Sequence, residues 1–322
     1  MTRRAALAGV TVAVALGPAV AQSPQKMLRV GYVTLLPRGE QHEAFLKRMA
    51  ELGYQEGANF AYEFRHVGSF QEYPAAYSEL AQRGCDILIA AGNEVAFKAA
   101  AAAAADRIPV VFFALDFDPF AKGLVTSLAK PGGNMTGIFV RQIELARKRV
   151  ELVRQALPEA RALWLLWDAV SRDQADAAAE VASTLGFEPH LVESAGEPPD
   201  YAAILAPIAQ SPGAPVIIPA SPRFYRDRVA LLALLLERPI PTIGAFPEHA
   251  ESGALLSYGV AVAAVQRDLA PYVDRIAKGA RPADIPIEQP THFDMIINLK
   301  TAKALNLELS PVLIARADEV IE

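Results

Sequence analysis

Residues that commonly carry out catalysis are present in this chain, but their spacing matches no familiar catalytic motif. The sequence has no Gly-x-Ser-x-Gly elbow, no Gly-x-x-x-x-Gly-Lys-Ser/Thr loop and no Gly-x-Gly-x-x-Gly turn. The five histidines, at positions 42, 66, 190, 249 and 292, lack the spacing of metal ligands. We therefore expect neither catalysis nor a cofactor or metal. A Ser-His-Asp triad assembled in space stays open as an alternative, because spacing alone cannot exclude it.

Candidate binding residues are selected instead by their position after short apolar runs that we interpret as strands. In parallel α/β sheets, ligands bind outside the carboxyl ends of the strands. This rule, with Tyr258 added at a predicted crossing between lobes, predicts a small-molecule site. Its members are Leu36, Pro37, Gly92, Asn93, Glu94, Asp116, Asp118, Trp167, Asp168, Ser221, Phe224, Phe246, Glu248 and Tyr258. Structural alternatives stay open: Asp118-Pro119 is typical of a turn, Asp168 can cap a helix, and Phe246 can belong to the core.

The charges of these candidates indicate which charge the ligand should carry. Glu94 in a first helical turn already complements the helix dipole, so it would repel a second anion. With Asp116 and Asp118 nearby in the sequence, the first lobe is better suited to an ammonium or a hydroxyl than to a carboxylate. Arg38 or Arg223 could supply the opposite charge.

Strand-like and helix-like segments alternate along the first half of the chain. Phe45, Met49 and Leu52 lie on one helical face, and Gly53 ends that helix. The expected strands are 28–36, 60–66, 87–90 and 110–114, and the expected helices are 45–52, 73–82 and 94–105. This order predicts parallel strands joined by crossover helices.

The same alternation continues in the second half, so we expect two similar lobes. The helices expected there are 143–157, 173–185, 201–210, 225–237 and 262–276, and the strands are 163–167, 188–192, 216–218, 254–258 and 293–298. The helix 225–237 is apolar nearly all round, which predicts burial, with a partner interface as the alternative. We expect an α/β fold of two doubly wound parallel-sheet lobes. Lobe 1 is predicted over 28–138 and 257–282, and lobe 2 over 139–256 and 283–322, so that several segments connect the lobes as a hinge.

The N-terminus has the pattern of an export signal. A basic start, Met1–Arg4, precedes an apolar stretch of roughly 16 residues, shorter than the ~20 that span a bilayer. Ala19-Val20-Ala21 then gives a small-x-small cleavage pattern. We predict a signal peptide over residues 1–21 and a periplasmic protein, with an uncleaved membrane anchor as the alternative. Thr2-Arg3-Arg4 leaves the twin-arginine route open beside the general secretory one.

Net charge and cysteine content exclude further classes. The 322 residues carry a formal net charge of −5, and no run of lysines or arginines follows the N-terminal segment. A nucleic acid is therefore not an expected partner. Cys85 is the only cysteine, so no internal disulfide can form, and we expect a small buried side chain there.

Several segments resemble one family, the ABC-transporter substrate-binding proteins of the TrpX-like group. The resemblance is spread over the chain after the N-terminal segment and is most specific at the Pro-Gly-Gly-Asn turn and the C-terminal segments. The segments are Glu51-Leu-Gly-Tyr-Gln-Glu-Gly57, Gly123-Leu-Val-Thr-Ser-Leu-Ala-Lys-Pro-Gly-Gly-Asn-Met-Thr-Gly137, Leu256-Ser-Tyr-Gly259, Ile297-Asn-Leu-Lys-Thr-Ala-Lys-Ala-Leu305 and Ala315-Arg-Ala-Asp-Glu-Val-Ile321.

The resemblance implies a type I periplasmic binding protein fold with a three-segment hinge. It implies a monomer that closes over a small organic solute, amino-acid-like and in some relatives aromatic, and delivers it to the permease and ATPase of an inner-membrane importer. The chain departs from the family at 92–95 and 167–170, where a Gly/Thr-rich turn and an Asn-Pro turn are usual. The solute therefore cannot be copied from relatives. A secreted α/β hydrolase and a solute receptor for a sensor stay open as alternatives.

Overall fold

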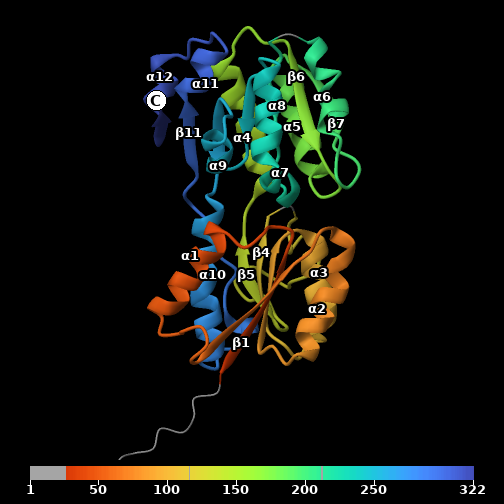
Figure 1. Cartoon of the computed structure of the whole chain (residues 1–322), viewed down its shortest axis with the longest axis vertical. Coiled ribbons are helices and arrows are strands. Elements are labelled where there is room, and N and C mark those ends of the chain that lie inside the picture. Colours follow the sequence, from red (N-terminus) through yellow and green to blue (C-terminus); the bar gives the residue numbers. More distant parts are fainter. Residues whose placement is uncertain (1–26, 116, 212) are drawn as a thin grey trace, which may run out of the picture.

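The computed structural model describes residues 27–115, 117–211 and 213–322, which form two α/β lobes, one above the other in Figure 1. The predicted signal peptide, residues 1–21, and the candidate residue Asp116 lie outside the described residues. The predicted fold class is confirmed: each lobe is built on a sheet whose strands are joined mainly by crossover helices.

Lobe 1, the lower lobe in Figure 1, contains a five-stranded parallel sheet with the order β2-β1-β3-β4-β5. Helices α1 and α10 pack together on one face of this sheet, and α2 and α3 pack together on the other (Figure 1). The elements are β1 (Leu28–Thr34), α1 (Glu40–Glu51), β2 (Phe60–His66), the 3-10 turn η1 (Phe70–Glu72), α2 (Tyr73–Gln82), β3 (Ile87–Gly92), α3 (Glu94–Ala104), β4 (Val110–Ala114), β5 (Met135–Phe139) and α10 (Val262–Ala277).

Lobe 2 contains a seven-stranded sheet with the order β12-β11-β10-β9-β8-β6-β7. All described neighbours in it are parallel except β10 and β11, which run antiparallel. The strands are β6 (Ala162–Trp167), β7 (Glu188–Glu193), β8 (Val216–Ile217), β9 (Thr242–Gly244), β10 (Leu256–Gly259), β11 (Asp294–Asn298) and β12 (Glu319–Ile321). The helices are α4 (Gln142–Ala156), α5 (Arg172–Thr184), α6 (Tyr201–Leu205), α7 (Pro222–Arg226), α8 (Arg228–Glu237), α9 (Pro247–Glu251), α11 (Leu299–Ala304) and α12 (Pro311–Ile314), with the 3-10 turn η2 (Ile208–Gln210). The 3-10 turn η3 (Pro282–Asp284) packs against β5 of lobe 1.

The described part of the chain crosses between the lobes at three places: between β5 and α4, between β10 and α10, and ahead of β11. The segment after α10 stays with lobe 1, because Thr136 Oγ1 donates to the carbonyl of Ile285 (2.7 Å). Ile287 N likewise donates to the carbonyl of Leu128 (2.7 Å). The structure therefore places the second and third crossings a few residues later than the predicted boundaries at 257 and 283.

Some predicted elements differ in detail for local reasons. The predicted helix 225–237 is divided at Asp227 into α7 and α8, and Val229 is 64 % exposed, so burial all round is wrong there. The strand β5 was not predicted. Gly137 in β5 has a φ of 155°, and a Cβ there would lie 1.9 Å from the carbonyl oxygen of Phe112, so the strands approach as closely as only glycine permits.

Arg149 of α4 is fully buried, and within the described residues none of its hydrogen bonds goes to a carboxylate. Its Nε donates to the carbonyl of Tyr258 (2.8 Å), and its Nη2 donates to Gln142 Oε1 (2.9 Å) and the carbonyl of Ala245 (3.4 Å). Burial lowers the pKa of the guanidinium to about 9, so the side chain is charged at neutral pH. One cation thus connects the start of α4, the end of β9 and the end of β10.

We expect Arg149→Ala to lower the free energy of unfolding by roughly 3 kcal/mol, because the change leaves several buried oxygens without donors. Urea unfolding measures the change. The matched control is Arg147→Ala on the same helix: Arg147 is exposed and pairs with Glu180 (3.1 Å), so its loss should cost no more than about 0.5 kcal/mol. Equal stability of the two variants would contradict the assigned role of Arg149.

Candidate ligand-binding site

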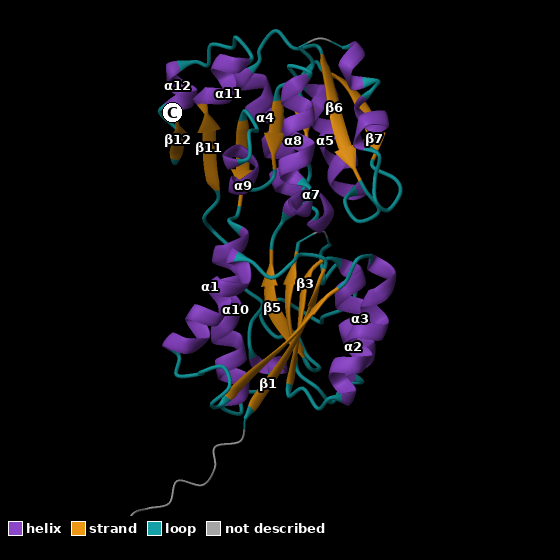
Figure 2. Ribbon diagram, viewed as in Figure 1, coloured by secondary structure: helices purple, strands orange, loops and turns teal. Residues whose placement is uncertain are grey.

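The carboxyl ends of the two sheets face each other across the gap between the lobes. In Figure 2 the arrow of β5 points toward the upper lobe, and the arrow of β6 points back toward the lower one. A small hollow lies at this meeting point, which we call the interlobe cavity. It is lined by Tyr32, Thr34, Leu36, Ala91, Gly92, Phe113 and Leu115 from lobe 1, Ser221, Pro222, Tyr225 and Phe246 from lobe 2, and Val262 and Gln266 from α10.

The lobes touch at this cavity. A Cβ placed on Gly92 would lie 3.0 Å from Cγ of Pro222, across the gap. The remaining space is about 30 Å³, which is room for roughly one water molecule. Sites for organic ligands are about 300 Å³ or more. An organic solute can therefore enter only when the lobes or the lining side chains move apart.

Aromatic side chains form much of the cavity wall. Tyr225 and Phe246 contact each other edge to face, with ring centroids 5.4 Å apart. Tyr32 of β1 and Phe113 of β4 also line the cavity. Burial raises the pKa values of Tyr32 and Tyr225, so both phenols are neutral at physiological pH. The wall thus combines apolar ring faces with neutral hydroxyl groups.

The polar atoms of the cavity gather where α10 begins. Gln266 Nε2 donates to Tyr32 Oη (2.5 Å), while its Oε1 is buried and has no partner among the described residues. Beside it, Glu248 Oε1 accepts from Tyr225 Oη (3.3 Å) and from Val262 N (3.2 Å). Glu248 Oε2 is also buried without a partner in the described part of the chain. Burial raises the pKa of this carboxyl group.

Four of the predicted site residues line the cavity, and Glu248 contacts two residues that do. The four are Leu36, Gly92, Ser221 and Phe246. The Ser221 hydroxyl is already engaged, because it donates to Asp168 Oδ2 (2.5 Å), not to a histidine as in a catalytic triad. Asp168 is fully buried and also accepts from Ser171 Oγ (2.6 Å), so its carboxylate holds two loops of lobe 2 together.

The structure places the other predicted residues outside the cavity lining. Asn93 caps α3 by accepting from Ala96 N (2.8 Å), and Asp118 accepts from Phe120 N (2.8 Å) in a turn. The remaining positions are as follows: Pro37 is exposed, Glu94 pairs with Lys98 and Lys122, Trp167 lies under the guanidinium of Arg172, Phe224 is in the lobe 2 core, and Tyr258 packs on Phe293.

The two arginines predicted to supply a positive charge to the site form ion pairs outside the cavity lining. Arg38 pairs with Glu43 (3.3 Å) and Glu56 (3.4 Å) on the surface. Arg223 is buried, donates to the carbonyl of Ser194 (2.7 Å) and pairs with Glu197 (2.9 Å). Among the described residues that line the cavity, none is a lysine or an arginine.

Sequence reasoning missed Tyr32, Thr34, Tyr225 and Gln266. Tyr32 and Thr34 lie on β1 with the same alternation that leads to Leu36, so the face of the strand was a usable signal. Gln266 is a polar residue within the apolar stripe of α10, between Val262 and Leu269. A polar interruption of that kind is the signal that could have identified it.

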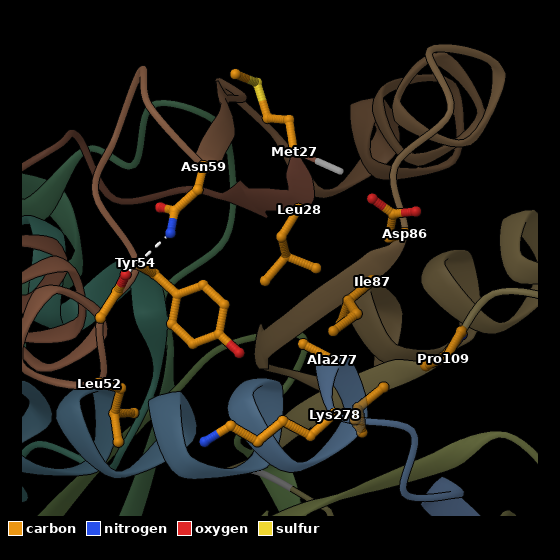
Figure 3. Close-up of a pocket in the computed structure, with 12 residues that line it drawn as sticks. Met27, Leu28, Leu52, Tyr54, Asn59, Asp86, Ile87, Pro109, Ala277 and Lys278 are labelled. Atoms are coloured by element: carbon orange, nitrogen blue, oxygen red, sulfur yellow. Dashed lines mark hydrogen bonds between the residues drawn. The ribbon is translucent and has the colours of Figure 1, made fainter. Parts of the chain in front are cut away.

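A second hollow, of about 530 Å³, lies at the opposite end of lobe 1 (Figure 3). It is formed where β1 and β3 begin, by Leu28, Tyr54 and Asp86 among others, and Lys278 lies at its edge. Its polar groups are already engaged: Tyr54 Oη donates to Asp274 (3.0 Å), and Asp86 accepts from Arg29 N (2.9 Å). Because ligands of parallel sheets bind at the carboxyl ends of strands, this hollow at the amino ends is not the candidate site.

Two further searches of the described residues bear on the class of protein. No cluster of three or more His, Cys, Asp or Glu side chains that could hold a metal ion occurs in the described ranges. No described helix has the length and apolar character needed to cross a membrane.

Comparison with known proteins decides the family. The sequence profile of the ABC transporter substrate binding proteins matches residues 38–321. The chain belongs to that family. This confirms the resemblance inferred from the sequence, and the family and its fold are those of binding proteins.

Three known proteins are similar to this substrate-binding protein over most of its length. A tyrosine-binding protein of Clostridioides difficile (strain R20291) is 25 % identical over 272 residues, covering 83 % of this chain and 76 % of the relative. The structure is similar to an ABC domain from Streptococcus pneumoniae in complex with L-Trp, with a TM-score of 0.81, 19 % identity and coverage of 92 % and 100 % of the two chains. A conserved domain protein from Vibrio cholerae matches with a TM-score of 0.82, 19 % identity and the same coverage.

The stability of this substrate-binding protein should depend on two buried histidines. Burial lowers the pKa of His249 to about 3, and its neutral ring accepts from Ala245 N (3.0 Å). Burial, aided by Arg38, lowers the pKa of His42 to about 4. In the unfolded chain both titrate near 6.5. Below that pH the unfolded state binds more protons, so the free energy of unfolding should fall by on the order of 3 kcal/mol between pH 7 and pH 5.

Urea unfolding at the two pH values measures this loss. His249→Asn should reduce the pH dependence, because it removes one of the two buried rings. A free energy of unfolding that is the same at pH 7 and pH 5 would contradict the assignment of both buried rings as neutral.

Proposed function

We propose that this chain is an exported solute receptor of an ABC importer. It captures an amino-acid-like solute with an aromatic or apolar body between its lobes and presents it to a permease and an ATPase. The observation that carries the proposal is the interlobe cavity, because the carboxyl ends of both sheets meet there over a wall of aromatic rings.

The three crossings between the lobes support a mechanism of capture by closure. The described conformation has the lobes in contact at Gly92 and Pro222, with space for about one water between them. Separation about the crossings opens the cavity to solvent, and closure then buries the solute. The solute favours the closed form only to the extent that it binds that form more tightly.

The character of the wall supports the proposed solute class. A flat apolar group of the solute can pack against aromatic rings of the cavity wall. These are the rings of Tyr32, Phe113, Tyr225 and Phe246. The relative from Clostridioides difficile is named a tyrosine-binding protein, and the structure from Streptococcus pneumoniae contains L-Trp. These two names agree with what the cavity wall suggests for this chain.

The N-terminal sequence supports a place outside the inner membrane. A basic start, a short apolar stretch and the Ala19-Val20-Ala21 pattern are typical of a cleaved signal peptide. We propose cleavage after Ala21, a periplasmic location and a monomeric receptor. N-terminal sequencing of the protein from a periplasmic extract should begin at Gln22, and a start at Met1 in the membrane fraction would contradict the proposal.

Solute binding at the interlobe cavity is tested by isothermal titration with aromatic and aliphatic amino acids. The protein is first unfolded in guanidinium and refolded, which removes bound solute. Leu36→Ala should weaken binding of the best solute about tenfold, because Leu36 lines the cavity. Leu52→Ala, in the hollow of Figure 3, is the matched control and should leave the affinity unchanged. The reverse result would move the site to that second hollow.

A further inference from the structure

Two buried oxygen atoms without a donor among the described residues lie at the interlobe cavity, one on a lining residue and one on a residue that contacts the lining. They are Oε2 of Glu248 and Oε1 of Gln266, and neither has a hydrogen-bond partner in the described part of the chain. Gln266 is only 2 % exposed and lines the cavity. Buried polar atoms normally find partners, so two unpartnered oxygens beside one cavity point to a group that supplies hydrogen-bond donors.

Glu248 of α9 and Gln266 of α10 come together at the first turns of α10. Glu248 Oε1 accepts from the backbone N–H of Val262, the first residue of α10 (3.2 Å). Gln266 lies four residues later on that helix, hence on the same face and one turn away. Val262 and Gln266 both line the cavity, as does Tyr225, which donates to Glu248 Oε1 (3.3 Å). Both side chains are therefore placed at the start of α10, where this helix meets the cavity.

The described hydrogen-bond donors to Glu248, Tyr225 Oη and Val262 N, are both neutral. No lysine or arginine occurs among the described residues of the lining. Arg228 packs on the ring of Tyr225 (4.5 Å), but its hydrogen bond goes to the Tyr225 carbonyl (2.9 Å), not to Glu248. An unpaired buried carboxylate is costly, and a cation next to it offsets that cost. The ring faces of Tyr225 and Phe246 at the same cavity also favour a cation.

We propose that Glu248 and Gln266 form the recognition site for a protonated amine, so that the solute must carry an ammonium group and need not carry a carboxylate. This inference deepens the proposed function and rests on it. Glu248 forms the ion pair, Gln266 accepts a second N–H, and the aromatic wall holds the body of the solute. The substrate class is an amine or amino acid with an apolar or aromatic body.

Matched compounds separate the contribution of the two ends of the solute. Isothermal titration would compare each amino acid with its decarboxylated amine and its deaminated acid: L-tyrosine, tyramine and 3-(4-hydroxyphenyl)propionate, and the corresponding tryptophan and leucine sets. We expect the amines and amino acids to bind and the deaminated acids to bind at least a hundredfold more weakly. Deaminated acids that bind as well as the amines would overturn the inference and leave the receptor function standing. If no compound in any set binds, the proposed solute class fails as well.

Variants assign the effect to the two residues. Glu248→Gln keeps an oxygen for Val262 N, and it should weaken binding of the amines at least tenfold while leaving the weak binding of the acids unchanged. Gln266→Leu should weaken binding of the amines about tenfold. The control is Glu237→Gln, at an exposed position at the end of α8, which should have no effect. Circular dichroism melting confirms that each variant is folded, and an equal loss for amines and acids in Glu248→Gln would overturn the assigned role.

Discussion

The buried guanidinium of Arg149 connects three segments that the sequence keeps far apart: the start of α4, the end of β9 and the end of β10. Two of these segments adjoin crossings between the lobes, and the third leads directly into Phe246 of the cavity wall. Because a buried cation without a carboxylate partner needs all of its acceptors, the three segments cannot shift independently without losing hydrogen bonds. We therefore expect these segments of lobe 2 to move as one rigid unit. The change in backbone angles that opens the lobes then falls in the residues of the crossings.

The hinge also explains why the cavity combines residues from distant parts of the chain. After completing most of lobe 2, the chain returns through β10 to form α10, which packs beside α1 on the lobe 1 sheet. The first turns of α10 place Val262 and Gln266 at the cavity, where Glu248 of lobe 2 accepts from Val262 N. Gln266 in turn donates to Tyr32 on the first strand of the chain. The polar wall formed by Glu248, Val262 and Gln266 thus depends on the return of the chain from lobe 2 to lobe 1.

Much of the fold could be predicted from periodicity, and part of the site from topology. The long amphipathic helices α4 and α10 were predictable because one face of each is buried along its length, whereas the break at Asp227 depends on tertiary packing. The strand-end rule selected Leu36 and Phe246, which follow strands and line the interlobe cavity. It missed Tyr32 and Gln266, because they lie inside regular elements and reach the cavity only through the placement of one lobe against the other.

The polar wall has a consequence for the balance between open and closed forms. When the lobes are together, Glu248 Oε2 and Gln266 Oε1, which have no donor among the described residues, are withdrawn from bulk water, and this costs free energy. Separation of the lobes restores their hydration, so this cost opposes closure of the protein alone. A solute that donates to both oxygens offsets the cost only in the closed form, and that difference in affinity is what can shift the equilibrium. A solute that fills the aromatic wall without donating would leave the cost in place. On the proposed function, the same two oxygens would couple the selection of the solute to the closure of the lobes.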